Sequence, residues 1–139
     1  MAPFLFSMKL ETERLILRKP TLKDAEDLSK NGHEKIMPRL TQYLPYPFTV
    51  RKARKLIKDF WLNKKKGISG FCIFLKKENK VVGIVDIYNI DKKHKKAKIG
   101  CWIGKNYRGK GLASEAVGLA LLFAWNNLHL NKLSTKRRC

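Results

Sequence analysis

Apolar residues in the first half of the chain recur with the spacing of amphipathic helices. Five of them follow the i, i+3, i+4, i+7, i+8 spacing that gathers side chains on one helix face: Ala53, Leu56, Ile57, Phe60 and Trp61. Thr49 is suited to cap this helix, and Gly67 is suited to end it after the lysines at 64–66. The pattern therefore predicts a helix that begins at residue 49.

A shorter helix is predicted over residues 21–31. Thr21 is its expected N-cap, and the apolar residues expected to face the core are Leu22, Ala25 and Leu28. Gly32 is expected to supply a left-handed turn at its end. Between the two helices, residues 38–48 hold three prolines and three aromatic residues, which predicts an irregular connector.

Strand-like runs lie on both sides of these helices. The first strand is predicted over residues 11–18, and three further runs lie close together at 71–75, 81–90 and 97–103. Turn-like residues separate the three runs, which predicts an antiparallel meander. A loop at 104–110 leads to a helix over 111–128, which is apolar nearly all round and is expected to be buried on most sides. Another strand is expected to begin within 130–134.

Length and composition indicate a single folded domain over residues 1–139, with 44% apolar residues. No apolar run approaches the roughly 20 residues that span a bilayer, and the start does not resemble a secretion signal. Three isolated cysteines indicate reduced thiols in a cytoplasmic protein. The three histidines lie far apart without ligand spacing, so no metal site is expected.

Basic residues far outnumber acidic ones. The chain has 31 Lys and Arg against 11 Asp and Glu, a formal net charge of +20. This charge predicts attraction to phosphates or to acidic partners. The lysine clusters fit a surface that faces RNA or the ribosome, and they equally fit a solvated surface without a partner.

The segment 99–115 is the part of the sequence with recognisable binding chemistry. A strand enters it, a loop with three glycines follows, and an apolar helix leaves it. The first amides of a helix have no intrahelical acceptor and lie at the positive end of the helix dipole, so they bind anions. Arg108 and Lys110 add positive charge at the same place. A phosphate group is the expected ligand.

Two common phosphate-binding motifs match this loop only in part. Residues 104–110 fit the GxxxxGK of nucleotide triphosphatases, but Gly111 stands where Ser or Thr must hold magnesium. The dinucleotide fingerprint GxGxxG would need a glycine at Ser114. Both motifs also belong to parallel βαβ units, whereas a meander precedes this loop. A triphosphatase therefore remains a distant alternative.

A third pattern fits both the loop and its surroundings. Residues 108–113, RGKGLA, resemble the (Arg/Gln)-x-x-Gly-x-(Gly/Ala) pyrophosphate loop of GNAT-family acetyltransferases. Further ordered matches are similar to the RimJ/RimL branch, the ribosomal-protein-alanine N-acetyltransferases: LETERLILR at 10–18, PYP at 45–47, VG at 82–83 and A-x-IG-x-W at 97–102. The resemblance implies an α+β GNAT fold, with a mixed, mainly antiparallel sheet flanked by helices.

The resemblance also implies a cofactor and a site. Acetyl-CoA would be the acetyl donor, with its pyrophosphate on the amides of residues 108–113 and its pantetheine beside residues 101–103. The expected cofactor-binding residues are Cys101, Trp102, Ile103, Arg108, Gly109, Lys110, Gly111, Leu112 and Ala113. The acceptor would be an amine, with the N-terminal α-amine of a protein, such as a ribosomal protein, as the leading class.

The sequence departs from the family pattern in three places. Lys98 stands where the family often has a proton-accepting glutamate, and Cys101 stands where it commonly has a tyrosine. Family members continue well past Leu130, so an incomplete domain is expected, one that lacks C-terminal strands and leaves an unpaired edge on the strand at 97–103. No catalytic residue is assigned, because Asp86 is expected to face solvent rather than the amine.

Two function classes therefore remain. The leading prediction is an acetyl-CoA-dependent N-acetyltransferase, with an oligomer possible. The alternative is a catalytically inactive protein, derived from a truncated domain of this kind, that binds CoA or RNA phosphates. The aromatic residues of the connector, Tyr43, Tyr46 and Phe48, fit an acceptor pocket as well as simple packing.

Overall fold

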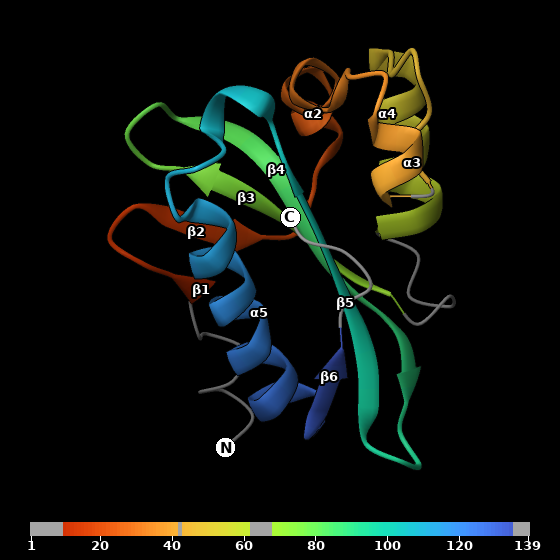
Figure 1. Ribbon diagram of the computed structural model, residues 1–139, viewed down its shortest axis with the longest axis vertical. Helices are drawn as coiled ribbons and strands as arrows, with labels where there is room; N and C mark the ends of the chain where they lie inside the picture. Colours follow the sequence, from red (N-terminus) through yellow and green to blue (C-terminus); the bar gives the residue numbers. More distant parts are fainter. Residues whose placement is uncertain (1–9, 42, 62–67, 135–139) are drawn as a thin grey trace.

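The computed structural model describes residues 10–41, 43–61 and 68–134. Its strands form one sheet in the order β1 (Leu10–Glu11), β2 (Leu15–Arg18), β3 (Ser69–Leu75), β4 (Lys80–Asp91), β5 (Lys96–Ile103) and β6 (Lys132–Ser134). Helices α2 (Ala25–Gly32), α3 (Met37–Thr41) and α4 (Val50–Leu56) pack on one face, and α5 (Leu112–Asn127) packs on the other (Figure 1). The expected α+β fold is confirmed.

The chain begins with a hairpin. The prediction of one strand over residues 11–18 is wrong, because the chain turns after β1 and pairs it antiparallel with β2. The Thr12 hydroxyl accepts the amides of Arg14 at 3.3 Å and Leu15 at 3.2 Å. A threonine that bonds amides two and three residues ahead stabilises a turn in competition with extended backbone.

The predicted meander is confirmed. β3 pairs antiparallel with β4, and β4 pairs antiparallel with β5. The expectation of an unpaired edge on β5 is corrected over its first part, because β6 pairs with it in parallel, from Lys96 opposite Lys132 to Lys98 opposite Ser134. The sheet is therefore mixed, with a single parallel pair among the described strands.

The helix predicted over residues 21–31 forms as a 3₁₀ turn, η1 (Leu22–Asp24), followed by α2. Leu22 is exposed rather than inward-facing, whereas Ala25 and Leu28 are buried as expected. Gly32 does not adopt the predicted left-handed turn. A Cβ at Gly32 would lie 2.9 Å from the Phe48 ring and 3.1 Å from the indole of Trp102. Its lack of a side chain therefore serves close packing.

The connector at 38–48 is only partly irregular, because α3 forms across its start. Pro38 is compatible with this helix, since the first helical positions need no amide bond. The predicted N-cap at Thr49 is confirmed, with its hydroxyl accepting the Lys52 amide at 3.2 Å. After α4 the backbone widens into a π-helical turn, η2 (Ile57–Trp61). The predicted lysines at 64–66 and the stop at 67 lie outside the described residues.

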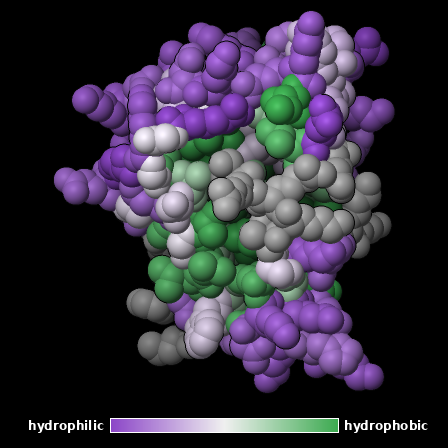
Figure 2. Space-filling view, viewed as in Figure 1, coloured by the Kyte–Doolittle hydropathy of each residue, from purple (hydrophilic) through white to green (hydrophobic). Residues whose placement is uncertain are grey.

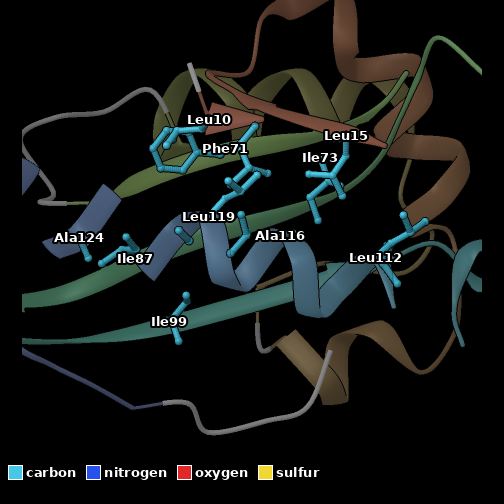
Figure 3. Close-up of a cluster of buried hydrophobic side chains, with 14 of the residues drawn as sticks. Leu10, Leu15, Phe71, Ile73, Ile87, Ile99, Leu112, Ala116, Leu119 and Ala124 are labelled. Carbon is cyan, nitrogen blue, oxygen red and sulfur yellow. The ribbon is translucent and has the colours of Figure 1, made fainter. Parts of the chain in front are cut away.

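Each face of the sheet has its own apolar core. One core packs α5 onto the sheet through residues such as Leu15, Ile73, Ile99 and Leu119 (Figure 3). The other core lies beneath α2, α3 and α4 and includes Trp61 and Trp102. Because the sheet is covered on both sides, the side chains of its central strands are buried whichever way they point.

The prediction that α5 is buried on most sides is only partly right. Three of its large apolar side chains remain exposed: Leu121 (42%), Leu122 (55%) and Trp125 (66%). Figure 2 shows apolar side chains gathered over this helix, with hydrophilic residues above and below them. No helix in the described part of the chain, α5 included, is long and apolar enough to cross a membrane.

Candidate functional site

The loop between β5 and α5 starts in the sheet and ends at the helix N-terminus. The Gly104 amide donates to the Val82 carbonyl at 2.8 Å, and a 3₁₀ turn, η4 (Lys105–Tyr107), follows. Gly109 (φ +76°) and Gly111 (φ +79°) adopt left-handed backbone conformations, and Gly111 is the N-cap of α5. Side chains are strained at such φ values, so these two positions favour glycine.

The amides of this loop point to an anion site. The first backbone bond of α5 runs from the Glu115 amide to the Gly111 carbonyl at 3.1 Å. Among the described groups, none accepts from the amides of residues 109–114. The Arg108 amide differs, because it donates to the Lys105 carbonyl at 3.4 Å. Free amides at the N-terminus of a 16-residue helix, where the dipole is positive, favour a phosphate group.

The two basic side chains of the loop behave differently. The Arg108 guanidinium donates to the Ile103 carbonyl at 3.0 Å and pairs with the Glu34 carboxylate, which lies between α2 and α3. Arg108 therefore links the loop to the sheet face that α2, α3 and α4 cover. Lys110 is exposed, with its Nζ 5.9 Å from the centre of the Tyr107 ring. Of the two side chains, Lys110 is the one open to solvent.

A clamp that sequence reasoning missed holds the other side of the loop. Arg14 of the β1–β2 turn donates to the Lys110 carbonyl at 2.8 Å and forms an ion pair with Glu115. Glu115 also accepts the Thr12 hydroxyl at 2.8 Å. The carboxylate in the first turn of α5 is thus neutralised by Arg14. A sequence signal existed, since an acidic residue in a first helical turn is favourable, but its partner lies 101 residues away.

A pocket of about 480 Å³ opens beside this clamp. Its walls come from the β1–β2 turn, the β3–β4 turn and the loop, and include Arg14, Lys76, Lys77, Glu78, Tyr107 and Lys110. The Tyr107 hydroxyl donates to Glu78 at 3.0 Å. Within the described residues, no group of three or more His, Cys, Asp or Glu side chains could hold a metal ion.

The strand residues expected beside the cofactor offer mainly backbone. Trp102 and Ile103 are buried, in the cores on opposite faces of the sheet, and Leu112 is buried under the loop. Cys101 is half-buried and packs against the α5 core. A ligand along β5 would therefore meet its main chain, while the side chains of Trp102 and Ile103 hold the strand in place.

Asp86 is the residue that sequence reasoning misplaced. It is 2% exposed, so the expectation of a solvent-facing side chain is wrong. The Tyr43 hydroxyl donates to its Oδ2 at 3.2 Å. Burial raises the pKa of Asp86 to about 6, although the Tyr43 hydroxyl, the nearby Trp61 indole and the Gly100 amide oppose the rise. Of the other connector aromatics, Phe48 is fully buried and Tyr46 is exposed.

Comparison with known proteins decides the family. The model of the Acetyltransferase (GNAT) domain matches residues 14–137. The chain belongs to the GNAT family. It is 36% identical over 132 residues to "Uncharacterized N-acetyltransferase p20" of Bacillus licheniformis, covering 91% of this chain and 71% of that protein.

Solved GNAT structures share the fold. A "putative ribosomal-protein-serine acetyltransferase" from Vibrio cholerae superposes with a TM-score of 0.74 at 29% identity, over 91% of this chain and 72% of the other. The ribosomal α-N-protein acetyltransferase RimL, in complex with coenzyme A, superposes with a TM-score of 0.77 at 17% identity, over 91% and 72% of the two chains. The GNAT fold predicted from the sequence is confirmed.

Proposed function

We propose that this GNAT domain binds acetyl-CoA at the β5–α5 loop and transfers the acetyl group to an amine. The observation that carries the proposal is the row of amides at 109–113 that no described group occupies, at the positive end of α5. Membership of an acetyltransferase family supports the same reaction. Bound acetyl-CoA would supply the acetyl group as a thioester.

The chain's own residues have three tasks in this reaction. The amides of Gly109, Lys110, Gly111, Leu112 and Ala113 hold the pyrophosphate, and exposed Lys110 adds charge. The main chain at Cys101, Trp102 and Ile103 lies beside the pantetheine, where an amide in an oxyanion-hole role polarises the thioester carbonyl. Arg108 holds the loop in position, because its guanidinium pairs with the Glu34 carboxylate.

The acceptor class we propose is the N-terminal α-amine of a protein, with ribosomal proteins as the leading candidates. The name of the Vibrio cholerae relative supports this class. The formal net charge of +20 also suits a protein that works near ribosomal RNA. We place the reaction in the cytoplasm, because Cys72 carries a buried thiol rather than a disulfide.

Gly111→Glu tests the proposed cofactor site. The change puts a side chain and a negative charge where the pyrophosphate binds, 3.3 Å from the Arg14 guanidinium and at a left-handed φ. We expect acetyl-CoA affinity, measured by isothermal titration calorimetry, to fall more than about 100-fold, or about 2.7 kcal/mol. Gly118→Glu is the matched control, since a Cβ there meets open space on the same helix. It should leave the affinity unchanged.

Two further measurements keep this test decisive. Lys110→Glu alters an exposed side chain without backbone strain, so it should weaken acetyl-CoA binding while the unfolding transition stays unchanged. Titration with ribosomal RNA addresses the alternative class. Tight, salt-sensitive RNA binding without any heat from acetyl-CoA would contradict the proposed function and favour an inactive phosphate-binding protein.

A further inference from the structure

A second group of polar side chains converges inside the protein, on the sheet face opposite α5. Asp86 of β4 accepts the Tyr43 hydroxyl at 3.2 Å. The indole Nε1 atoms of Trp61 and Trp102 are buried and make no hydrogen bond to any described group. Trp61 and Trp102 are 1% and 3% exposed. Two donors and a carboxylate with spare acceptor positions are therefore held together away from solvent.

The two indoles face the Asp86–Tyr43 pair. Burial and the Asp86 carboxylate raise the pKa of Tyr43 overall, and the nearby indoles of Trp61 and Trp102 oppose this rise. The indole of Trp61 likewise opposes the rise in the pKa of Asp86 that burial causes. Neither indole reaches full hydrogen-bond geometry. The indoles therefore border the Asp86–Tyr43 pair and leave acceptor positions of the carboxylate available to another donor.

Glycines on both neighbouring strands allow Trp61 and the Asp86 carboxylate to pack directly against the sheet. In the sheet register, Asp86 lies opposite Gly70 of β3 and opposite Gly100 of β5. A Cβ at Gly70 would lie 2.7 Å from the Trp61 ring, and a Cβ at Gly100 would lie 2.7 Å from Asp86 Oδ1. Trp61 thus covers one glycine, and the carboxylate covers the other.

Aromatic rings line the remaining side. The Tyr43 ring centre lies 5.1 Å from that of Phe60 and 5.9 Å from that of Trp61. A carboxylate beside aromatic faces is a suitable environment for an ammonium group, because ring faces attract cations and the carboxylate neutralises them. The chemistry of the cluster therefore selects a cationic amine.

The cluster also lies where an acceptor can meet the acetyl group. Gly100 is four residues before Gly104, the start of the cofactor loop, which is about 13 Å along the strand. An extended pantetheine arm beside β5 has a comparable length. Gly100, Lys98 and Tyr88 are half-buried on this face of the sheet, next to the buried Asp86.

From this geometry we infer that Asp86 and Tyr43, enclosed by Trp61, Trp102 and Phe60, form the binding site for the acceptor's ammonium group. Asp86 binds the cation and accepts its proton, and Tyr43 holds the carboxylate in position. The inference rests on the proposed function and narrows its acceptor to a primary amine that arrives charged.

In the proposed step, two protons leave the ammonium nitrogen and one electron pair moves to the thioester sulfur. The ammonium gives one proton to the Asp86 carboxylate, which leaves a nitrogen lone pair. The amine nitrogen then bonds to the acetyl carbonyl carbon while the carbon–sulfur bond breaks, and the departing sulfur takes the electron pair and the second amine proton. Asp86 returns its proton to solvent. No oxidant or reductant takes part.

The titratable groups around Asp86 come from each packed element. They are Tyr43 before α4, Cys72 on β3, Tyr88 on β4 and Lys98 on β5, all on the same sheet face. With its pKa raised to about 6 by burial, Asp86 is mostly ionised at pH 7 and still basic enough to take a proton. The rate should therefore rise with pH through about 6.

The kinetic test uses Asp86→Asn, a seryl peptide with a free α-amine, and acetyl-CoA. We expect kcat/KM for the peptide to fall about 100-fold, with loss of the rise in rate through pH 6, and the acetyl-CoA affinity to stay unchanged. Tyr43→Phe should raise the peptide KM several-fold. Asp91→Asn, the same change at the half-buried end of β4, is the matched control.

A binding measurement separates the inference from the proposed function. The chain has three tryptophans, and Trp125 on the outer face of α5 serves as an internal reference. In ¹⁵N NMR spectra, the seryl peptide should shift the indole signals of Trp61 and Trp102 but not of Trp125, and the N-acetylated peptide should shift none. These shifts do not depend on turnover.

Each outcome has a definite meaning. If the wild type turns over the peptide and Asp86→Asn matches it, or if the two buried indole signals stay unmoved at saturating peptide, the inference is wrong and acetyl transfer stands. If the free-amine peptide shifts both signals but no acetyl transfer occurs, the amine site stands and the proposed function fails.

Discussion

At the scale of single residues, Asp24 shows how one carboxylate can join several segments. It accepts the Arg18 guanidinium at 2.8 and 2.9 Å and the Thr21 amide at 2.7 Å, and the Cys72 thiol lies 3.6 Å away. Burial alone would raise the pKa of Asp24, but the hydrogen bonds from Arg18 and Thr21 outweigh it and lower the pKa. The ionised form therefore stabilises the folded state.

The sign of the resulting pH dependence follows from that lowered pKa. Stability from Asp24 is present above its unfolded pKa, near 3.9, and is lost as the pH falls through the folded value. We expect Asp24→Asn to lower the free energy of unfolding by about 2 kcal/mol at pH 7, a figure moderated by the partial exposure of Arg18. In urea unfolding, the difference from wild type should shrink at pH 3.

Glu26→Gln is the matched control for this prediction. Glu26 is exposed in the first turn of α2, so its loss should cost no more than about 0.5 kcal/mol. If Asp24→Asn lowers the free energy of unfolding by the same amount at pH 7 and at pH 3, the charge of the carboxylate does not contribute to stability.

At the scale of elements, close packing explains why two glycines differ. Gly70 lies under Trp61 where η2 crosses β3, and a Cβ there would approach the indole within 2.7 Å. Gly118 lies on the exposed side of α5, where a Cβ meets open space. The absence of a side chain at Gly70 allows η2 and β3 to pack closely. Gly118, by contrast, only lowers the helix propensity of α5.

Replacing each glycine by alanine should therefore change stability in opposite directions. Gly70→Ala is expected to lower the free energy of unfolding by about 1–3 kcal/mol, because the overlap with Trp61 forces the elements apart. Gly118→Ala is expected to raise it by about 0.5–1 kcal/mol. Urea unfolding measures both, and a neutral Gly70→Ala would mean that Trp61 moves freely.

How far the elements could be predicted depended on whether their signals were local. The meander and α5 were predictable, because β-branched runs and a glycine before an apolar stretch are local signals. The β1–β2 turn depends on one threonine hydroxyl, and α3 crosses a proline-containing segment that looks irregular by composition. Such weak signals do not separate a strand from a hairpin.

At the scale of the whole molecule, charge and apolar surface are distributed differently. The formal net charge of +20 is spread over lysines and arginines along the chain, whereas α5 carries three exposed large apolar side chains close together: Leu121, Leu122 and Trp125 (Figure 2). A long-range positive field attracts polyanions without reading their sequence. The proposed site of acetyl transfer, by contrast, depends on particular amides and on Asp86.

This difference predicts that RNA binding and acetyl-CoA binding respond differently to salt. We expect the affinity for poly-U RNA to fall roughly tenfold or more between 50 and 200 mM salt, since several phosphate contacts are released. Acetyl-CoA binding, through oriented amides, should change much less. Filter binding and calorimetry at both salt concentrations measure the two effects, and equal salt dependence would argue against a built pyrophosphate site.

The candidate site shows the same division between local and tertiary information. The loop was predictable, because glycines and basic residues at a strand–helix junction are neighbours in sequence. The Arg14–Glu115 clamp and the burial of Asp86 were not. Asp86 follows an apolar run and carries no sign that helices cover both faces of its strand.

The amino-acid sequence by itself therefore determined the β3–β4–β5 meander, the helix that follows it, the phosphate-type loop and the family. Only the tertiary structure decided which polar groups are removed from water, because burial depends on what packs across the sheet from distant segments. That is why Asp86, Tyr43, Trp61 and Trp102 meet in space although 59 positions separate the first from the last of them along the chain.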